Sequence, residues 1–164
     1  MDATEGEIVE LFPAKGPGRA TSPPHLLYTI RNTSCTRAVS HSSDAGLSWT
    51  SATRAPTPMN EDPGCKGGIT RWEAGRALIF ANAGTCAAAR IDTTVRISLD
   101  NGVTWPHAQL IDKDSGYTTP QMLEDEDGGS MIGVVYEKQP PFVDGCSIHF
   151  ATVDAREILA GGKP

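Results

Sequence analysis

Ser42-Ser43-Asp44-Ala45-Gly46-Leu47-Ser48-Trp49 and Ser98-Leu99-Asp100-Asn101-Gly102-Val103-Thr104-Trp105 are two copies of one pattern, SxDxGxxW. The second copy begins 56 residues after the first, and a repeat of that period is typical of propeller blades or solenoid units. We expect the Asp to accept backbone hydrogen bonds, the Gly to take a positive φ and the Trp to pack beside the hairpin. The pattern thus predicts two hairpin turns, which depend on Ser42, Asp44, Gly46, Trp49, Ser98, Asp100, Gly102 and Trp105.

The rest of the chain is a series of short β-rich runs. Each run is bounded by Gly, Pro, Asn, Asp or Ser, which is typical of an all-β sandwich, barrel or propeller. The predicted strands are 7–12, 26–31, 37–41, 68–72, 77–81, 93–98, 131–137 and 147–153. At four strands per blade they make about three antiparallel blades, fewer than a closed propeller needs. Residues 154–160 predict one helical turn.

Composition supports this all-β interpretation. The 164 residues include 17 Gly and 12 Pro, and only 38% are hydrophobic, which argues against a helical bundle. The length suits one domain, and no linker divides residues 1–164. Two loops, 13–24 and 55–68, are rich in Pro and Gly.

Charge excludes several kinds of partner. The formal net charge is −6, so no basic stripe is available for nucleic acid or for anionic lipid headgroups. No apolar run reaches the roughly 20 residues of a membrane span, and residues 1–20 lack the features of a signal peptide. These observations do not indicate a compartment.

Neither cysteine nor histidine spacing predicts a metal site or another cofactor. The four cysteines form no CxxC pair, and the histidines are scattered. An even number of cysteines permits two disulfides, but we favour isolated buried thiols. The residues are Cys35, Cys65, Cys86 and Cys146, and His25, His41, His107 and His149.

The repeated pattern resembles the Asp-box of sialidases, and its surroundings resemble the C-terminal half of an exo-α-sialidase, a six-bladed propeller. The similar segments hold their order and spacing from about residue 5 to residue 153. They are EGEIVEL (5–11), YTIRN (28–32), CKGG (65–68), Arg90 followed by VRIS (95–98), YT (117–118) and YE (136–137). The resemblance implies a partial six-bladed propeller of about three blades.

The resemblance also implies roles for five residues. Sialic acid has a carboxylate on its anomeric carbon, and guanidinium groups bind carboxylates bidentately. Because that carboxylate would repel a carboxylate nucleophile, sialidases use a tyrosine, which needs a neighbouring base. Tyr117 is the implied nucleophile and Glu5 the implied base, with Glu7 as the alternative base. Arg31 and Arg90 are implied to bind substrate, and Glu137 to orient the first arginine of the family's triad.

The sequence lacks several residues that the family uses for catalysis and substrate binding. The first arginine, the aspartate that acts as general acid and the earliest Asp-boxes belong to the N-terminal half of a sialidase and are not in this sequence. Lys66 and Thr118 replace a family glutamine and serine. We therefore expect the isolated chain to show no sialidase turnover, since loss of a general acid typically costs about 10² to 10⁴ in rate.

Several functions stay open at this stage. The resemblance implies hydrolysis of terminal α-linked sialic acids, with retention, from glycoproteins, gangliosides or oligosaccharides. The alternatives are a trans-sialidase, a different Asp-box propeller without the sialidase site, and a non-catalytic half-propeller that binds an acidic sugar or a protein partner. The exposed edges of the terminal blades also predict association with another molecule.

Overall fold

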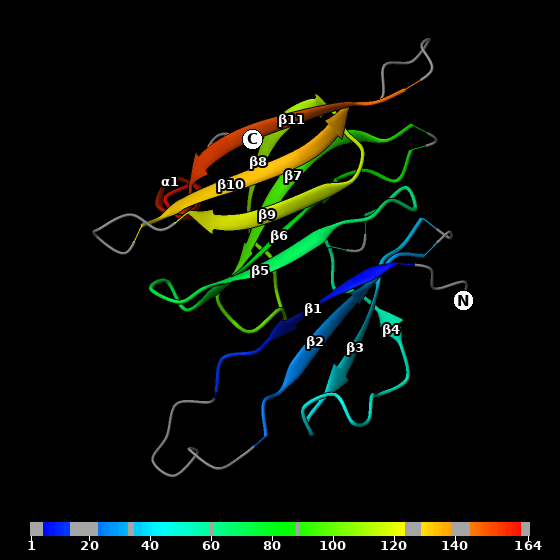
Figure 1. Ribbon diagram of the computed structural model, residues 1–164, viewed down its shortest axis with the longest axis vertical. Helices are drawn as coiled ribbons and strands as arrows, with labels where there is room; N and C mark the ends of the chain where they lie inside the picture. Colours follow the sequence, from blue (N-terminus) through cyan, green and yellow to red (C-terminus); the bar gives the residue numbers. More distant parts are fainter. Residues whose placement is uncertain are drawn as a thin grey trace.

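The computed structural model confirms the all-β class and contains three antiparallel sheets (Figure 1). It describes residues 5–13, 23–32, 35–59, 61–87, 89–123, 129–138 and 145–161. The first sheet consists of β1 (Gly6–Glu10), β2 (Leu26–Ile30), β3 (Ala38–Ser42) and β4 (Thr53–Arg54). The second consists of β5 (Gly68–Trp72), β6 (Ala77–Ala83), β7 (Ile91–Ser98) and β8 (His107–Asp114).

The third sheet has three strands among the described residues, in the order β11-β10-β9. Its strands are β9 (Thr118–Leu123), β10 (Met131–Lys138) and β11 (Ser147–Asp154). Helix α1 (Ala155–Leu159) follows, and the carboxylate of its N-cap Asp154 accepts a hydrogen bond from the Arg156 backbone. The predicted helical turn is therefore present.

The second sheet lies between the other two and is covered on both faces. Every residue of β6 is buried. Leu78 and Phe80 pack in one core with residues of the first sheet, whereas Ile79 and Ala81 pack in another with residues of the third sheet and α1. A strand covered on both faces has a continuous apolar sequence, which explains the unbroken ALIF run of β6.

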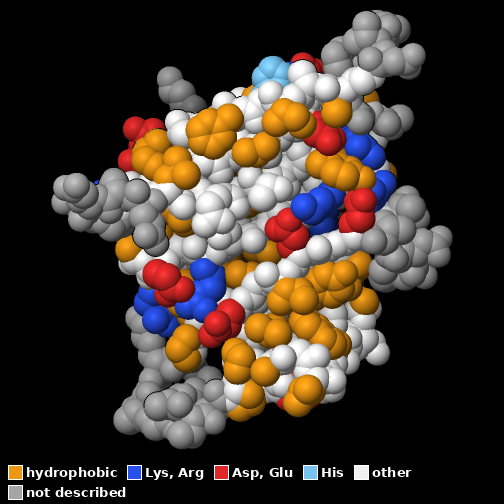
Figure 2. Space-filling view, viewed as in Figure 1, with side chains coloured by type: hydrophobic (Ala, Val, Ile, Leu, Met, Phe, Trp, Pro, Cys, Tyr) orange, Lys and Arg blue, Asp and Glu red, His pale blue; other side chains and the backbone are white. Residues whose placement is uncertain are grey.

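The outer faces of the two end sheets remain partly apolar. Figure 2 shows hydrophobic side chains gathered over the third sheet and, at the other end of the molecule, over the first. On the third sheet, Val135, Ile148 and Phe150 are exposed, and on the first sheet Ile8 is exposed. Association through these ends stays a prediction.

Three strands differ from the sequence prediction. β4, β8 and β9 were not expected as strands, and β9 contains Pro120, which cannot donate to a strand ladder. Because β9 lies at the edge of its sheet, a proline is tolerated there. The predicted loop 55–68 corresponds to the connection between β4 and β5. Most of the predicted loop 13–24 lies outside the described residues, and the single unit 1–164 remains a prediction.

Candidate active site

The five residues expected in the site come from one edge of the three sheets. Glu5 directly precedes β1, and Arg31 directly follows β2, its antiparallel neighbour. Arg90 directly precedes β7, Tyr117 directly precedes β9, and Glu137 lies near the end of β10. Antiparallel pairing therefore brings together residues that are far apart in the sequence.

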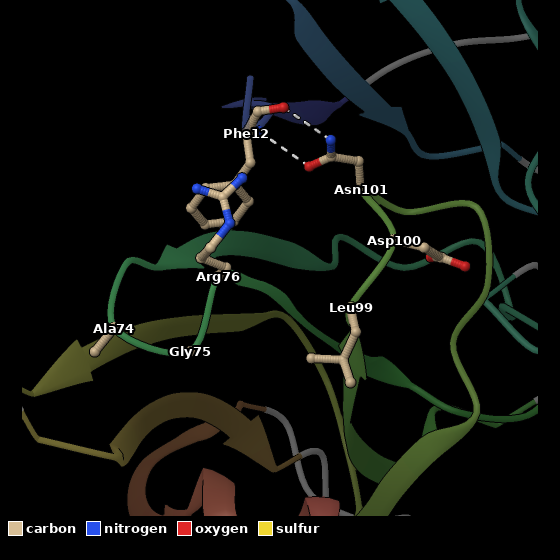
Figure 3. Close-up of a pocket in the computed structure, with 7 residues that line it drawn as sticks. All are labelled: Phe12, Ala74, Gly75, Arg76, Leu99, Asp100 and Asn101. Carbon is tan, nitrogen blue, oxygen red and sulfur yellow. Dashed lines mark hydrogen bonds between the residues drawn. The ribbon is translucent and has the colours of Figure 1, made fainter. Parts of the chain in front are cut away.

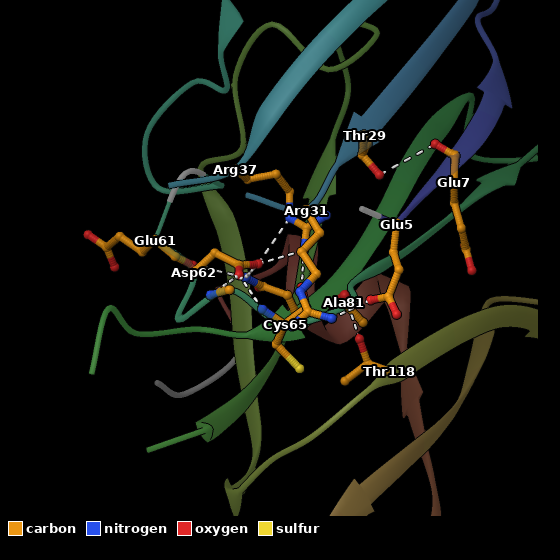
Figure 4. A network of polar contacts seen from close by, with 12 residues as sticks. Glu5, Glu7, Thr29, Arg31, Arg37, Glu61, Asp62, Cys65, Ala81 and Thr118 are labelled. Atoms are coloured by element: carbon orange, nitrogen blue, oxygen red, sulfur yellow. Dashed lines mark hydrogen bonds and ion pairs between the residues drawn. The ribbon is translucent and has the colours of Figure 1, made fainter. Parts of the chain in front are cut away.

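Tyr117, Glu5 and Arg31 form a closed triangle of hydrogen bonds. The Tyr117 hydroxyl donates to Glu5 Oε1 at 2.8 Å. Arg31 Nη1 donates to the Tyr117 hydroxyl at 2.9 Å and to Glu5 Oε2 at 2.6 Å. Figure 4 shows the Arg31 and Glu5 side chains directed toward one another. A carboxylate oxygen at this distance from a phenol oxygen has the geometry that a general base requires.

Arg90 approaches Tyr117 from the second sheet. Its Cζ lies 5.1 Å from the centre of the Tyr117 ring, and the Cζ of Arg31 lies 5.8 Å from the same point. Both distances are in the range of cation–π contacts. Two guanidinium groups, each on a different sheet, therefore flank the one phenol.

The charges of the triangle stabilise each other. The hydrogen bond from Arg31 is the main cause that lowers the pKa of Glu5 below its ordinary value; burial opposes this effect, and the Tyr117 hydroxyl adds to it. The same hydrogen bond to Glu5 raises the pKa of Arg31. Glu5 is therefore ionised at neutral pH, and an ionised carboxylate can only accept hydrogen bonds.

Glu137 holds the backbone of Tyr117. Its Oε2 accepts a hydrogen bond from the Tyr117 backbone N–H at 3.1 Å, and its own N–H donates to the Tyr117 carbonyl at 3.0 Å. A Cβ on Gly116 would come within 2.5 Å of the Glu137 Cβ, so glycine leaves room for this approach. The expected contact of Glu137 with a first arginine stays a prediction.

Glu7, the alternative base, lies in a different set of contacts. Its Oε1 pairs with Lys66 Nζ at 2.8 Å, and its Oε2 accepts a hydrogen bond from the Ile69 backbone at 3.0 Å. Glu7 thus joins β1 to the start of β5. Among the described residues, Glu5 is the glutamate that accepts the hydrogen bond of the Tyr117 hydroxyl.

A buried ionic network that was not predicted from the sequence lies beside this triangle. Arg37 donates twice to Asp62 Oδ2, at 2.6 and 3.1 Å, and once to the Cys65 carbonyl. Both charged side chains are fully buried. Asp62 Oδ1 accepts the backbone N–H groups of Gly64 and Cys65, so the pair fixes the loop before β5 (Figure 4). No local pattern in the sequence marks such a pair.

The two Asp-box turns have the same hydrogen bonds. In each, the Asp Oδ1 accepts from the backbone N–H four residues later, at 2.9 and 2.8 Å, and the Gly N–H donates to the Ser hydroxyl at 2.8 Å. The glycine φ angles are 90° and 85°. The environments of the tryptophans differ, because Trp105 is buried while Trp49 is 37% exposed.

A pocket lies at the opposite end of the second sheet. It has a volume of about 350 Å³ and is lined by Phe12, Ala74, Gly75, Arg76, Leu99, Asp100 and Asn101. Figure 3 shows Arg76 stacked over the Phe12 ring and two hydrogen bonds between Phe12 and Asn101. Leu99 lies just beyond the end of β7, whereas Arg90 precedes its start. The pocket is therefore separate from the Tyr117 site.

The cysteines differ from the isolated buried thiols that we favoured. Cys35 and Cys86 form a disulfide with a Cα–Cα distance of 5.2 Å. Cys65 is a buried free thiol and Cys146 an exposed one, and burial raises the pKa of Cys65 to about 11. The pairing was missed because it joins loops of two different sheets.

Neither a metal cluster nor a membrane helix occurs in the described part of the chain. Within those ranges, His, Cys, Asp and Glu side chains form no group of three or more that could hold a metal ion. None of the helical segments there is long and apolar enough to cross a bilayer.

Two Asp-box turns on packed antiparallel sheets define the class of Asp-box propeller proteins. The chain matches the BNR repeat-like domain over residues 18–134 and belongs to that family. It is 31% identical over 147 residues to a sialidase of Bacteroides fragilis (strain YCH46), a match that covers 83% of this chain and 24% of the relative. The chain therefore spans about a quarter of that relative's length.

A solved structure has the same fold. The K499G mutant of NanB sialidase from Streptococcus pneumoniae aligns with a TM-score of 0.71 and 16% identity, over 94% of this chain and 24% of that one. Together these similarities identify a sialidase-like BNR-repeat chain that folds as a partial β-propeller.

Proposed function

We propose that this chain carries the nucleophile, the base and two substrate-binding arginines of an exo-α-sialidase that releases terminal α-linked sialic acids with retention. The observation that carries the proposal is the 2.8 Å hydrogen bond from the Tyr117 hydroxyl to Glu5. The two arginines beside the same phenol support it.

In the proposed reaction, Arg31 and Arg90 bind the carboxylate of the sugar. Glu5 accepts the phenol proton as the Tyr117 oxygen attacks the anomeric carbon and the glycosidic bond breaks. Water then attacks the anomeric carbon of the sialyl-tyrosine and gives a proton to the carboxylate that the general acid has become. The bond between sugar and tyrosine breaks, Glu5 returns its proton to the Tyr117 oxygen, and the two displacements give overall retention. The departing oxygen needs a proton from a general acid, which the resemblance assigns to an aspartate that this sequence lacks.

The isolated chain is accordingly expected to release nothing measurable from a fluorogenic sialoside. Release that Tyr117→Phe abolishes would show that the 164 residues are sufficient for turnover. Such a result would overturn the expectation of an inactive chain while supporting Tyr117 as the nucleophile.

A substrate that needs no general acid can test the nucleophile directly. Fluoride leaves without protonation, so we would incubate the chain with a sialic acid derivative that has fluorine on the anomeric carbon and on the neighbouring carbon. The C–F bond at the anomeric carbon breaks, a C–O bond to Tyr117 forms, and Glu5 takes the phenol proton. Mass spectrometry of peptides is expected to locate the adduct on Tyr117.

Variants make this experiment specific. Tyr117→Phe is expected to abolish the adduct and Glu5→Gln to slow its formation. Tyr28→Phe should leave it unchanged, because the Tyr28 ring packs against Trp49. An adduct on Tyr28, or an unchanged rate in Glu5→Gln, would contradict the assigned roles.

The arginines require a binding experiment. Arg90→Ala is expected to weaken the binding of N-acetylneuraminic acid, followed by NMR titration. Arg76→Ala removes the same charge at the opposite end of the sheet and should have no effect. An equal loss of affinity in both variants would indicate that sugar binding depends only on the net charge of the chain.

A further inference from the structure

The disulfide links the two loops that carry Arg31 and Arg90. Cys35 lies four residues after Arg31, in the connection between β2 and β3 of the first sheet. Cys86 lies four residues before Arg90, in the connection between β6 and β7 of the second sheet. No strand ladder joins the two sheets among the described residues, so the disulfide is a covalent tie between them at this edge.

Each loop has well-anchored residues on one side of its cysteine, here called the inner side, and a site arginine on the other, the outer side. On the inner side, Arg37 is anchored by the buried bond to Asp62, and Gly84 donates a backbone hydrogen bond to Asp92 at the base of its hairpin. On the outer side are the two arginines. The guanidinium of Arg90 forms no hydrogen bond or ion pair with the described residues and contacts the Tyr117 ring, so its position depends on the backbone of its loop.

Tyr117 contacts an arginine from each loop. Arg31 donates to its hydroxyl at 2.9 Å, and the Cζ of Arg90 lies 5.1 Å from the centre of its ring. A movement of one loop relative to the other would change the separation of the two guanidinium groups. We propose that Cys35 and Cys86 are positioning residues, whose disulfide fixes Arg31 and Arg90 on either side of Tyr117 for a carboxylate ligand. This inference rests on the proposed function for the identity of that ligand.

The disulfide also stabilises the fold, so its positioning role needs variants that separate the two effects. The double variant Cys35→Ser/Cys86→Ser removes the disulfide and also the stability that the disulfide gives the fold. Two glycines inserted after Ala87 keep the disulfide but lengthen the tether to Arg90, at little cost in loop entropy. Cys146→Ser removes an exposed free thiol and is the matched control. Ser98→Ala removes a hydroxyl from the second Asp-box, at the opposite end of β7 from Arg90. It controls for a loss of stability with the disulfide intact.

Two measurements apply to all variants below their unfolding temperatures. One is the affinity for N-acetylneuraminic acid. The other needs no ligand: the rate at which phenylglyoxal modifies Arg90, located by peptide mass spectrometry and referred to the exposed Arg156. We expect the double variant and the insertion variant to bind N-acetylneuraminic acid about tenfold more weakly, because about one further side chain must be ordered on binding. Phenylglyoxal should modify Arg90 faster in both variants. Cys146→Ser and Ser98→Ala should match the wild type.

The outcomes separate this inference from the proposed function. Faster modification of Arg90 in the double variant and the insertion, without sugar binding in any form, would support positioning and contradict the sialic acid site. Unchanged modification in the insertion variant, with sugar binding intact, would overturn positioning and leave the site standing. The insertion keeps the test decisive if the double variant fails to fold.

Discussion

The hydroxyl of Tyr117 donates a 2.8 Å hydrogen bond to Glu5, which lies 112 positions earlier in the chain. Glu5 leads into the first sheet and Tyr117 into the third. The contact therefore exists only when all three sheets are packed together.

The stability that Glu5 contributes is expected to depend on pH. Because Arg31 lowers the folded-state pKa of Glu5, this contribution is present above the ordinary pKa of a glutamate and is lost as the pH falls through the lowered value. Glu5→Gln should cost less than about 1 kcal/mol at neutral pH, since the pair is partly exposed. Urea unfolding should show the difference from wild type shrinking as the pH falls below the ordinary pKa of a glutamate. Glu157→Gln, on α1, serves as control. A difference that grows on acidification would contradict the ion pair.

Gly116→Ala is expected to disturb Tyr117 through Glu137. The new methyl group would lie 2.5 Å from the Glu137 Cβ and 3.0 Å from its carbonyl oxygen, so Glu137 must move. Overpacking of this kind costs about 1–3 kcal/mol, and formation of the Tyr117 adduct should fall. Gly133→Ala meets the Phe150 ring instead; it should lower stability without changing adduct formation. An unaffected adduct in Gly116→Ala would show that Glu137 does not hold Tyr117.

Asp62→Asn is expected to be strongly destabilising. It leaves the fully buried Arg37 without its carboxylate, and breaking a buried pair costs about 3–5 kcal/mol. Glu7→Gln breaks the partly exposed pair with Lys66 and should cost less than about 1 kcal/mol. Urea unfolding of both variants checks this order, and equal losses would contradict it.

The two Asp-box tryptophans are expected to differ in importance. Trp105 is 1% exposed and packs edge-on against Phe80, whereas Trp49 is 37% exposed. Trp105→Ala should therefore cost about 3–5 kcal/mol, and Trp49→Ala clearly less. Chemical denaturation followed by circular dichroism compares them without relying on tryptophan fluorescence. A larger loss for Trp49 would mean that its outer face is covered in solution.

Reduction of the disulfide is expected to lower the free energy of unfolding. Dithiothreitol would convert Cys35 and Cys86 to two thiols and itself become a cyclic disulfide. For a sequence separation of 51 residues, the chain-entropy relation gives a loss of about 4 kcal/mol. Thermal unfolding with and without reductant measures it, and Cys146→Ser should respond like the wild type. A transition that reductant does not move would show that the pair is not oxidised.

The sequence predicted the fold better than the surroundings of the site. The two SxDxGxxW turns and the alternating strands depend on local chemistry, and the structure contains them. β9 was missed because Pro120 argues against a strand unless its edge position is known. The Cys35–Cys86 and Arg37–Asp62 pairs join loop segments that have no recognisable sequence pattern. Which residue pairs with which is decided by the packing of the sheets, so it could not be predicted from the sequence.

Glu137 illustrates the same limit within the candidate site. Its place in the Tyr-Glu pair was recognised from the resemblance, and the implied partner was an arginine. In the structure its carboxylate accepts the backbone N–H of Tyr117, a contact that depends on Gly116 and on the register of β9 with β10. Residue types could be listed from the sequence, but such a backbone contact could not.

The origin of the site residues in three separate sheets couples ligand binding to assembly. A molecule that contacts Arg31, Arg90 and Tyr117 together can bind only when the sheets are docked. By mass action, a ligand present at 100 times its dissociation constant would stabilise that docked state by about 2.7 kcal/mol. Such a ligand would then favour folding, and the melting temperature of the chain would report occupancy of the site even where no turnover occurs.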